Sequence, residues 1–133
     1  MSARHILFAQ FLAALVLAAL TWVAVTFYLY WRLWWFDIPM HAIGGLWAGL
    51  CAAWLLASRG KQFSLAWCLG FALIVGIAWE VFEYSEGIAA PYFASYPLDT
   101  LKDLITDLVG AVAGYLLARR GLSKNTDASR GMV

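Results

Sequence analysis

The sequence predicts an all-α integral membrane protein, folded as a compact four-transmembrane-helix bundle with both termini in the cytoplasm. Of its 133 residues, 64% are hydrophobic and only 13% are charged. A soluble domain carries about a quarter of charged residues, so this surface cannot face water on all sides. Apolar runs of spanning length, about 20 residues for about 30 Å of hydrocarbon, recur along the chain, and basic residues gather on one side of them. The net charge of +1 gives no field that attracts nucleic acid, so we expect no nucleic-acid partner.

Four apolar runs are bounded by residues that typically begin or end helices. The predicted spans cover residues 6–30, 38–57, 63–84 and 98–118. The first run is far longer than the apolar core of a signal peptide, which favours a retained span. Pro39 stands in the first turn of the second span, Gly60 follows its end and Gly121 follows the fourth. We therefore expect a transmembrane domain over residues 1–121 and a disordered cytoplasmic tail over residues 122–133.

The basic residues are divided unequally between the two sides of the predicted bundle. The side that carries both termini holds Arg4, Arg59, Lys61, Arg119, Arg120, Lys124 and Arg130. The other side holds Arg32 and Lys102. Cytoplasmic loops of membrane proteins are enriched in lysine and arginine. The expected location is therefore a bacterial cytoplasmic (inner) membrane, with both termini in the cytoplasm.

Acidic residues gather near the outer ends of the second, third and fourth predicted spans, together with one histidine. The candidate metal ligands are Asp37, His41, Glu80, Glu83, Asp99, Asp103 and Asp107. At about 100° per residue, the three aspartates of the fourth span share a helical face with Gly110 and Gly114. Small residues allow membrane helices to approach closely, so this face should point into the bundle. For Asp37 and Asp99, a role as N-terminal helix caps is an equal alternative.

Buried carboxylates in a membrane need compensation by protons, by basic side chains or by a bound cation. The six acids of the candidate set outnumber the nearby bases, which predicts a divalent metal ion as cofactor. Oxygen ligands with a single imidazole favour Mg²⁺, Mn²⁺ or Ca²⁺ over Zn²⁺ or iron. Protons shared among the carboxylates are the alternative.

A metal site at the outer leaflet suggests an enzyme that acts on a lipid phosphate or another polar lipid headgroup, as a hydrolase or transferase. In that hypothesis a carboxylate or His41 serves as general base, and Lys102 or Arg32 holds the anion. Lys102 could equally extend to the interface, as lysines near helix ends often do.

Two further functions fit the same residues. One is a non-catalytic accessory or lipid-binding subunit, and the other is a cation or proton pathway, although the cytoplasmic halves of the spans lack polar residues. The expected partners are membrane lipid and either a second copy of the chain or a larger membrane protein. Glycine pairs four residues apart, Gly45 with Gly49 and Gly110 with Gly114, could mediate a homodimer or pack within the bundle.

Three motifs in fixed order resemble those of a known family. They are Asp37-Ile-Pro-Met-His41, Trp79-Glu80-Val-Phe-Glu83, and the aspartates and glycines between Asp99 and Gly114. Over about residues 36–117 the chain resembles the YjdF-like predicted membrane proteins and, more distantly, the VanZ-like family associated with teicoplanin resistance. The resemblance supports the polar site but implies no defined reaction. Asp107 departs from it, because such families often have asparagine ahead of the glycines.

Overall fold

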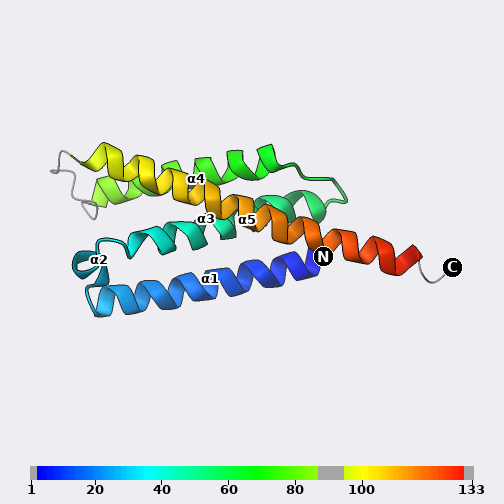
Figure 1. Cartoon of the computed structure of the whole chain (residues 1–133), viewed down its shortest axis with the longest axis horizontal. Helices are drawn as coiled ribbons and strands as arrows, with labels where there is room; N and C mark the ends of the chain where they lie inside the picture. The colour runs from blue at the N-terminus through cyan, green and yellow to red at the C-terminus, as the bar shows by residue number, and fades with distance from the viewer. Residues whose placement is uncertain (1–2, 87–94, 131–133) are drawn as a thin grey trace.

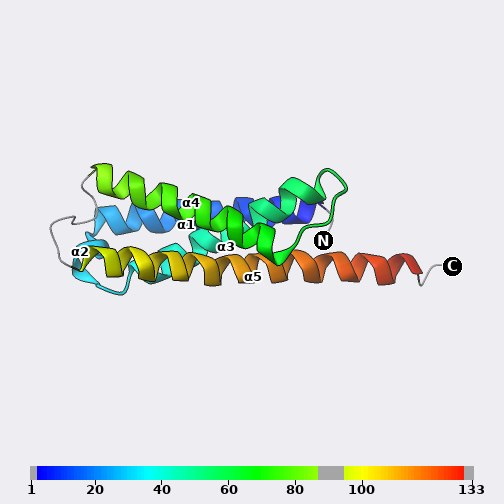
Figure 2. The same cartoon turned by 90° about the horizontal axis from the view of Figure 1, so that it is seen from above.

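The computed structural model describes residues 3–86 and 95–130, with side chains up to residue 120. The regular elements among these residues are all helices. The elements are α1 (Ala3–Thr26), α2 (Leu29–Arg32), α3 (Asp37–Ala57), α4 (Leu65–Glu86) and α5 (Tyr96–Arg130). The four long helices alternate in direction and run side by side, so that both chain ends lie at the same end of the bundle (Figures 1 and 2).

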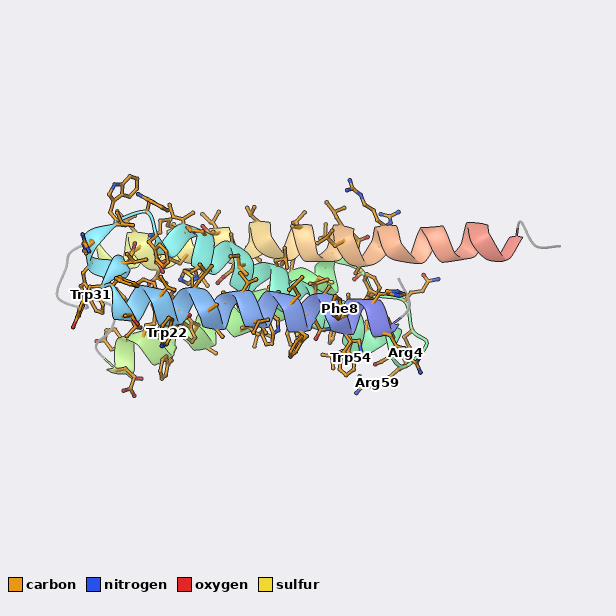
Figure 3. All side chains as sticks on the ribbon, turned by 90° about the horizontal axis from the view of Figure 1, so that it is seen from below. Arg4, Phe8, Trp22, Trp31, Trp54 and Arg59 are labelled. Carbon is orange, nitrogen blue, oxygen red and sulfur yellow. The ribbon has the colours of Figure 1, made fainter. Side chains whose placement is uncertain are left out.

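Three helices are long and apolar enough to cross a membrane. α1, α3 and α4 have mean hydropathies of 2.3, 1.5 and 2.0 over their best windows, and α5 is not among the spans identified by this criterion. This confirms an all-helical fold with three candidate membrane spans among the described residues. Large apolar side chains such as Phe8 and Trp22 point outward from α1, with 67% and 70% of their surface exposed (Figure 3). Such exposure suits contact with lipid rather than water.

The last residues of α1 and α5 differ most from the expected helix ends. The first helix ends at Thr26 instead of residue 30, because Tyr28 adopts the left-handed conformation (φ 57°) and α2 starts a new turn. α5 continues to Arg130, past Gly121, where the sequence predicts its end. Glycine lowers helix propensity but does not forbid helix, so Gly121 alone does not stop α5. The disorder expected of residues 122–133 stays a prediction, and residues 131–133 lie outside the described part.

The end of α3 follows the sequence signal. Gly60 has a positive φ of 67°, and its N–H donates to the Ala57 carbonyl at 3.1 Å. The Lys61 N–H reaches back to the Leu56 carbonyl at 2.9 Å. This pair of bonds is the Schellman motif, which uses a left-handed residue to satisfy the last carbonyls of a helix. The chain thereby ends α3 and turns back toward α4.

α3 lies at the centre of the bundle and packs against α1, α4 and α5 (Figure 1). Its tightest contact is with α5, where glycines of both helices meet. A Cβ at Gly45 would overlap the Asp107 carbonyl oxygen, and one at Gly49 would lie 2.7 Å from the Ala111 carbonyl oxygen. Cβ atoms on Gly110 and Gly114 would likewise meet main-chain atoms of α3. The two glycine pairs therefore pack against each other within one chain.

α1 is joined to α3 by a buried polar contact as well as by apolar packing. Gln10 is buried, and its Nε2 donates to the Leu50 carbonyl at 3.3 Å. The Cys51 thiol donates to Gln10 Oε1 at 3.2 Å. A buried amide in a membrane needs such partners, and they fix the position of α1 along α3.

Candidate functional site

The polar residues of α3, α4 and α5 meet at the end of the bundle opposite the termini. At their centre lies His41, which is 6% exposed. Its Nδ1 is 3.3 Å from Asp107 Oδ1 on α5, and its Nε2 is 3.5 Å from Asp37 Oδ1, one turn earlier on α3. An imidazole can donate from both nitrogens only when it is protonated. In this arrangement His41 therefore either carries a positive charge or gives up one of the two contacts.

Lys102 lies among carboxylates of this cluster instead of standing free. Its ammonium is 2.6 Å from Asp99 Oδ1, 3.3 Å from Asp103 Oδ1 and 3.9 Å from Asp37 Oδ2. The contact with Asp99 is a hydrogen bond between residues three apart on α5. The ammonium thus neutralises part of the acidic surplus, and in this geometry it faces acids.

Two buried carboxylate oxygens have no hydrogen-bond donor among the described residues. They are Asp103 Oδ1, in a residue 2% exposed, and Glu80 Oε1, in a residue 6% exposed. Asp103 Oδ1 has only the ion-pair contact with Lys102. The other oxygen of Glu80 accepts a hydrogen bond of 2.8 Å from the Thr100 hydroxyl. A buried carboxylate oxygen without a donor is costly, so Glu80 Oε1 requires a further partner, whereas Asp103 Oδ1 depends on the Lys102 ammonium alone.

The ligand atoms of two triads lie close enough to surround a single ion. Asp37, His41 and Asp103 form one triad, and His41, Glu80 and Glu83 form the other. In each triad the ligand atoms lie within 4.8 Å of one another. Five of the seven ligands predicted from the sequence are thus brought together, with His41 shared.

The remaining two predicted ligands, Asp99 and Asp107, have other contacts. Asp99 is half exposed and pairs with Lys102. Asp107 is buried, hydrogen-bonded to His41 and packed beside Gly76 of α4, where a Cβ would come within 2.5 Å of Asp107 Oδ2. Gly76 therefore makes the space in which Asp107 reaches His41.

Several residues that sequence reasoning did not select support the acids. Thr100 donates to Glu80, and the Tyr96 hydroxyl donates to the Glu80 carbonyl at 3.4 Å. The Trp79 indole N–H donates to Glu83 Oε1 at 2.9 Å. The first two bonds depend on the relative position of α4 and α5, which no sequence pattern specifies. The third joins residues four apart on one helix, a spacing that could have indicated it.

A cavity of about 300 Å³ opens beside the cluster, between α1, α3 and α4. Its apolar part is lined by residues such as Leu17, Ala72 and Val75, in the middle of their helices. At the end that lies opposite the termini it is lined by Thr21, Tyr30, Asp37, His41, Glu83 and Asp107. Burial, and then the nearby Asp37 carboxylate, raises the pKa of Tyr30, so its hydroxyl stays protonated. The cavity thus combines an apolar slot with a polar end of acids and hydrogen-bond donors.

Comparison with known proteins places these residues within a described family. A family model described as "Predicted membrane protein (DUF2238)" matches residues 2–124. A "UPF0314 protein" of Paracoccus denitrificans (strain Pd 1222) is 36% identical over 87 residues, which cover 62% of this chain and 43% of that protein. The chain therefore matches less than half of the length of this relative. No solved structure matches the chain. The resemblance to YjdF-like proteins is consistent with these matches, whereas a VanZ-like relationship is not shown by them.

Proposed function

The chain belongs to the DUF2238 family of predicted membrane proteins, and from this premise we propose that it binds a divalent cation within the membrane. The observation that carries the proposal is the pair of buried oxygens without hydrogen-bond donors, Asp103 Oδ1 and Glu80 Oε1. Each belongs to a residue of one triad, and a cation shared with His41 would satisfy it. Protons alone would have to neutralise several acids around one imidazole.

In the first triad, His41 has a carboxylate partner, Asp107, that suits metal binding. If Asp107 accepts the proton of His41 Nδ1, then Nε2 is left to face Asp37 and Asp103 as a ligand. A ligating histidine usually donates its other N–H to such a carboxylate, which fixes the ring. Lys102 would keep its shortest contact, with Asp99, while the cation takes its place beside the triad. The oxygen-rich ligand set favours Mg²⁺, Mn²⁺ or Ca²⁺ over Zn²⁺ or iron.

We also propose that α5 is a fourth span and that both termini are cytoplasmic, in a bacterial inner membrane. α5 runs alongside α3 in the direction expected of a fourth crossing, and its glycines pack into α3 (Figure 2). Arg4 and Arg59 lie at the end where the chain starts, and Trp31 lies at the opposite end (Figure 3). Basic residues favour the cytoplasmic side, so this asymmetry supports the orientation.

A second candidate is catalysis on a polar lipid headgroup by the same metal. The observation that favours it is the cavity, which reaches His41 and Glu83 from the side of α1 and α4. A metal there would polarise a phosphoryl oxygen. The role of His41 as general base requires the neutral ring, and Lys102 would have to leave the acids in order to hold an anion.

A pathway through the bundle has less support. On the cytoplasmic side of the cluster, α3 and α5 are in main-chain contact at Gly49 and Gly114. This contact leaves no space for water along that interface, and a conducted cation would need such a path.

The test is metal analysis of protein purified in mild detergent without chelator, followed by titration calorimetry with Mg²⁺, Mn²⁺, Ca²⁺ and Zn²⁺. We expect a bound cation that is lost in the double variant Glu80→Gln with Asp103→Asn. The matched control is Glu86→Gln, because Glu86 is an exposed acid on α4 outside both triads. Equal cation binding in the double variant and the control would overturn the proposal, as would the absence of any cation response in the wild type.

A further inference from the structure

The cavity between α1 and α4 has an apolar part and a polar end, which suits an amphipathic molecule. Both helices pack against α3, which forms the floor, while α1 and α4 form the walls. Ala18 on the α1 wall is exposed, and so is Trp79 on the α4 wall. Since these walls face outward between two candidate spans, the cavity is reached from the hydrocarbon of the bilayer.

The charges at the polar end select one kind of headgroup. The acids Asp37, Glu83 and Asp107 line this end, and no lysine or arginine is among the lining residues. Lys102, the cation nearest to the cluster, is held by three acids on the α5 side. An anionic headgroup placed here would meet three carboxylates, opposed by His41 and by the Lys102 ammonium 3.9 Å from Asp37 Oδ2, whereas the ammonium of a headgroup would be attracted.

We propose that this groove holds one membrane lipid with a primary-amine headgroup, its acyl chain between α1 and α4 and its ammonium at Glu83 and Asp37. An ammonium offers three N–H donors. Glu83 is already oriented by the Trp79 indole N–H on one oxygen. The apolar part of the cavity lies toward the middle of the helices and the polar part toward their outer ends, which matches the orientation of a lipid in the outer leaflet. The proposal goes beyond cation binding and does not require a metal in the triads.

The probe is a set of three lipids with identical acyl chains: phosphatidylethanolamine, phosphatidylcholine and phosphatidylglycerol. The full chain is exchanged into equimolar mixtures, and the retained lipid is identified by native mass spectrometry in the presence of EDTA. Choline carries the same charge as the amine but has no N–H donor. We expect the wild type to retain the amine lipid about tenfold over the choline lipid, because charge-assisted hydrogen bonds are lost with choline.

Two matched pairs of variants locate the effect. Glu83→Gln should reduce the amine preference to about twofold or less, whereas Glu86→Gln, three residues further on α4 and outside the groove, should leave it unchanged. Ala18→Trp places an indole in the groove and should abolish lipid retention. Ala19→Trp changes an equally exposed alanine that is not among the groove residues, and it should retain lipid as the wild type does. Both tryptophan variants keep every carboxylate, so they test the groove even if Glu83→Gln fails to fold.

The outcomes separate this proposal from the metal site. No amine preference in the wild type, a preference for phosphatidylglycerol, or a preference that survives both Glu83→Gln and Ala18→Trp would overturn it. An amine preference without any cation binding would support the groove while removing the metal proposal. Cation binding without an amine preference would support the metal proposal and remove the lipid proposal.

Discussion

Replacing Gly45 by alanine tests the contact between α3 and α5 on which the site depends. The new Cβ would overlap the Asp107 carbonyl oxygen and lie 2.6 Å from the Asp107 Cα. Carbon atoms in favourable contact lie about 3.5–4.0 Å apart, so the two helices would have to separate by about 1 Å. Such a gap forfeits about a quarter to a half of the dispersion energy of each contact along the interface.

The expected cost is at the upper end of the usual range for overpacking, about 3 kcal/mol. The main chain of α5 cannot swing aside as a flexible side chain could, and Asp107 would also move away from His41. We expect Gly45→Ala to unfold earlier in a mixed-micelle titration with a denaturing detergent and to bind cations more weakly than the wild type.

Gly70→Ala is the control for this substitution. Gly70 is also a helical glycine, on α4, but a Cβ there meets nothing within 4 Å. Its free energy of unfolding should equal that of the wild type or exceed it by up to about 1 kcal/mol, because alanine has the higher helix propensity. If Gly45→Ala is as stable as Gly70→Ala, the close packing of α3 on α5 is not a feature of the folded protein.

Three further predictions follow from individual contacts. Lys102→Met removes an ammonium that lies beside the first triad, so calorimetry should show divalent cations binding on the order of tenfold more tightly. Weaker binding would mean that Lys102 positions the ligands. Thr100→Val leaves both oxygens of Glu80 without a donor and should lower the free energy of unfolding by about 1–3 kcal/mol. Added cation should reduce this loss. A loss that cation does not reduce would mean that Glu80 is not a ligand of the site. Gly60→Ala puts a Cβ on a residue with positive φ and should cost about 1 kcal/mol in the same detergent titration, while an unchanged midpoint would contradict the role of this turn.

The membrane-spanning helices follow from the sequence because their cause is local. A run of apolar residues must satisfy its own backbone hydrogen bonds in hydrocarbon, and a helix does this without any partner. The sequence therefore predicts α1, α3 and α4 to within a few residues, including the turn at Gly60. The end of α1 was less predictable, since the left-handed Tyr28 carries no recognisable signal.

The membership of the acidic cluster was also partly predictable. The alternating direction of the helices brings one end of each of three helices to the same level, and the helical period turns their acids toward the small residues of the interior. The sequence thus indicated His41, Glu80 and Asp103, which the structure buries together. It left open whether the lysine at position 102 extends to the interface or lies over the site to hold an anion, because a long flexible side chain can do either.

Only the tertiary structure decided which of these groups meet and where a cavity opens beside them. The rotation of each helix about its axis and its shift along its neighbour determine the pairing of His41 with Asp107, the donation from Thr100 to Glu80 and the groove between α1 and α4. These two quantities are set by close packing at glycines such as Gly45 and Gly110, where main chains touch. The sequence marks such positions as small, but it does not say which partner fills the space, since that depends on every other contact in the bundle.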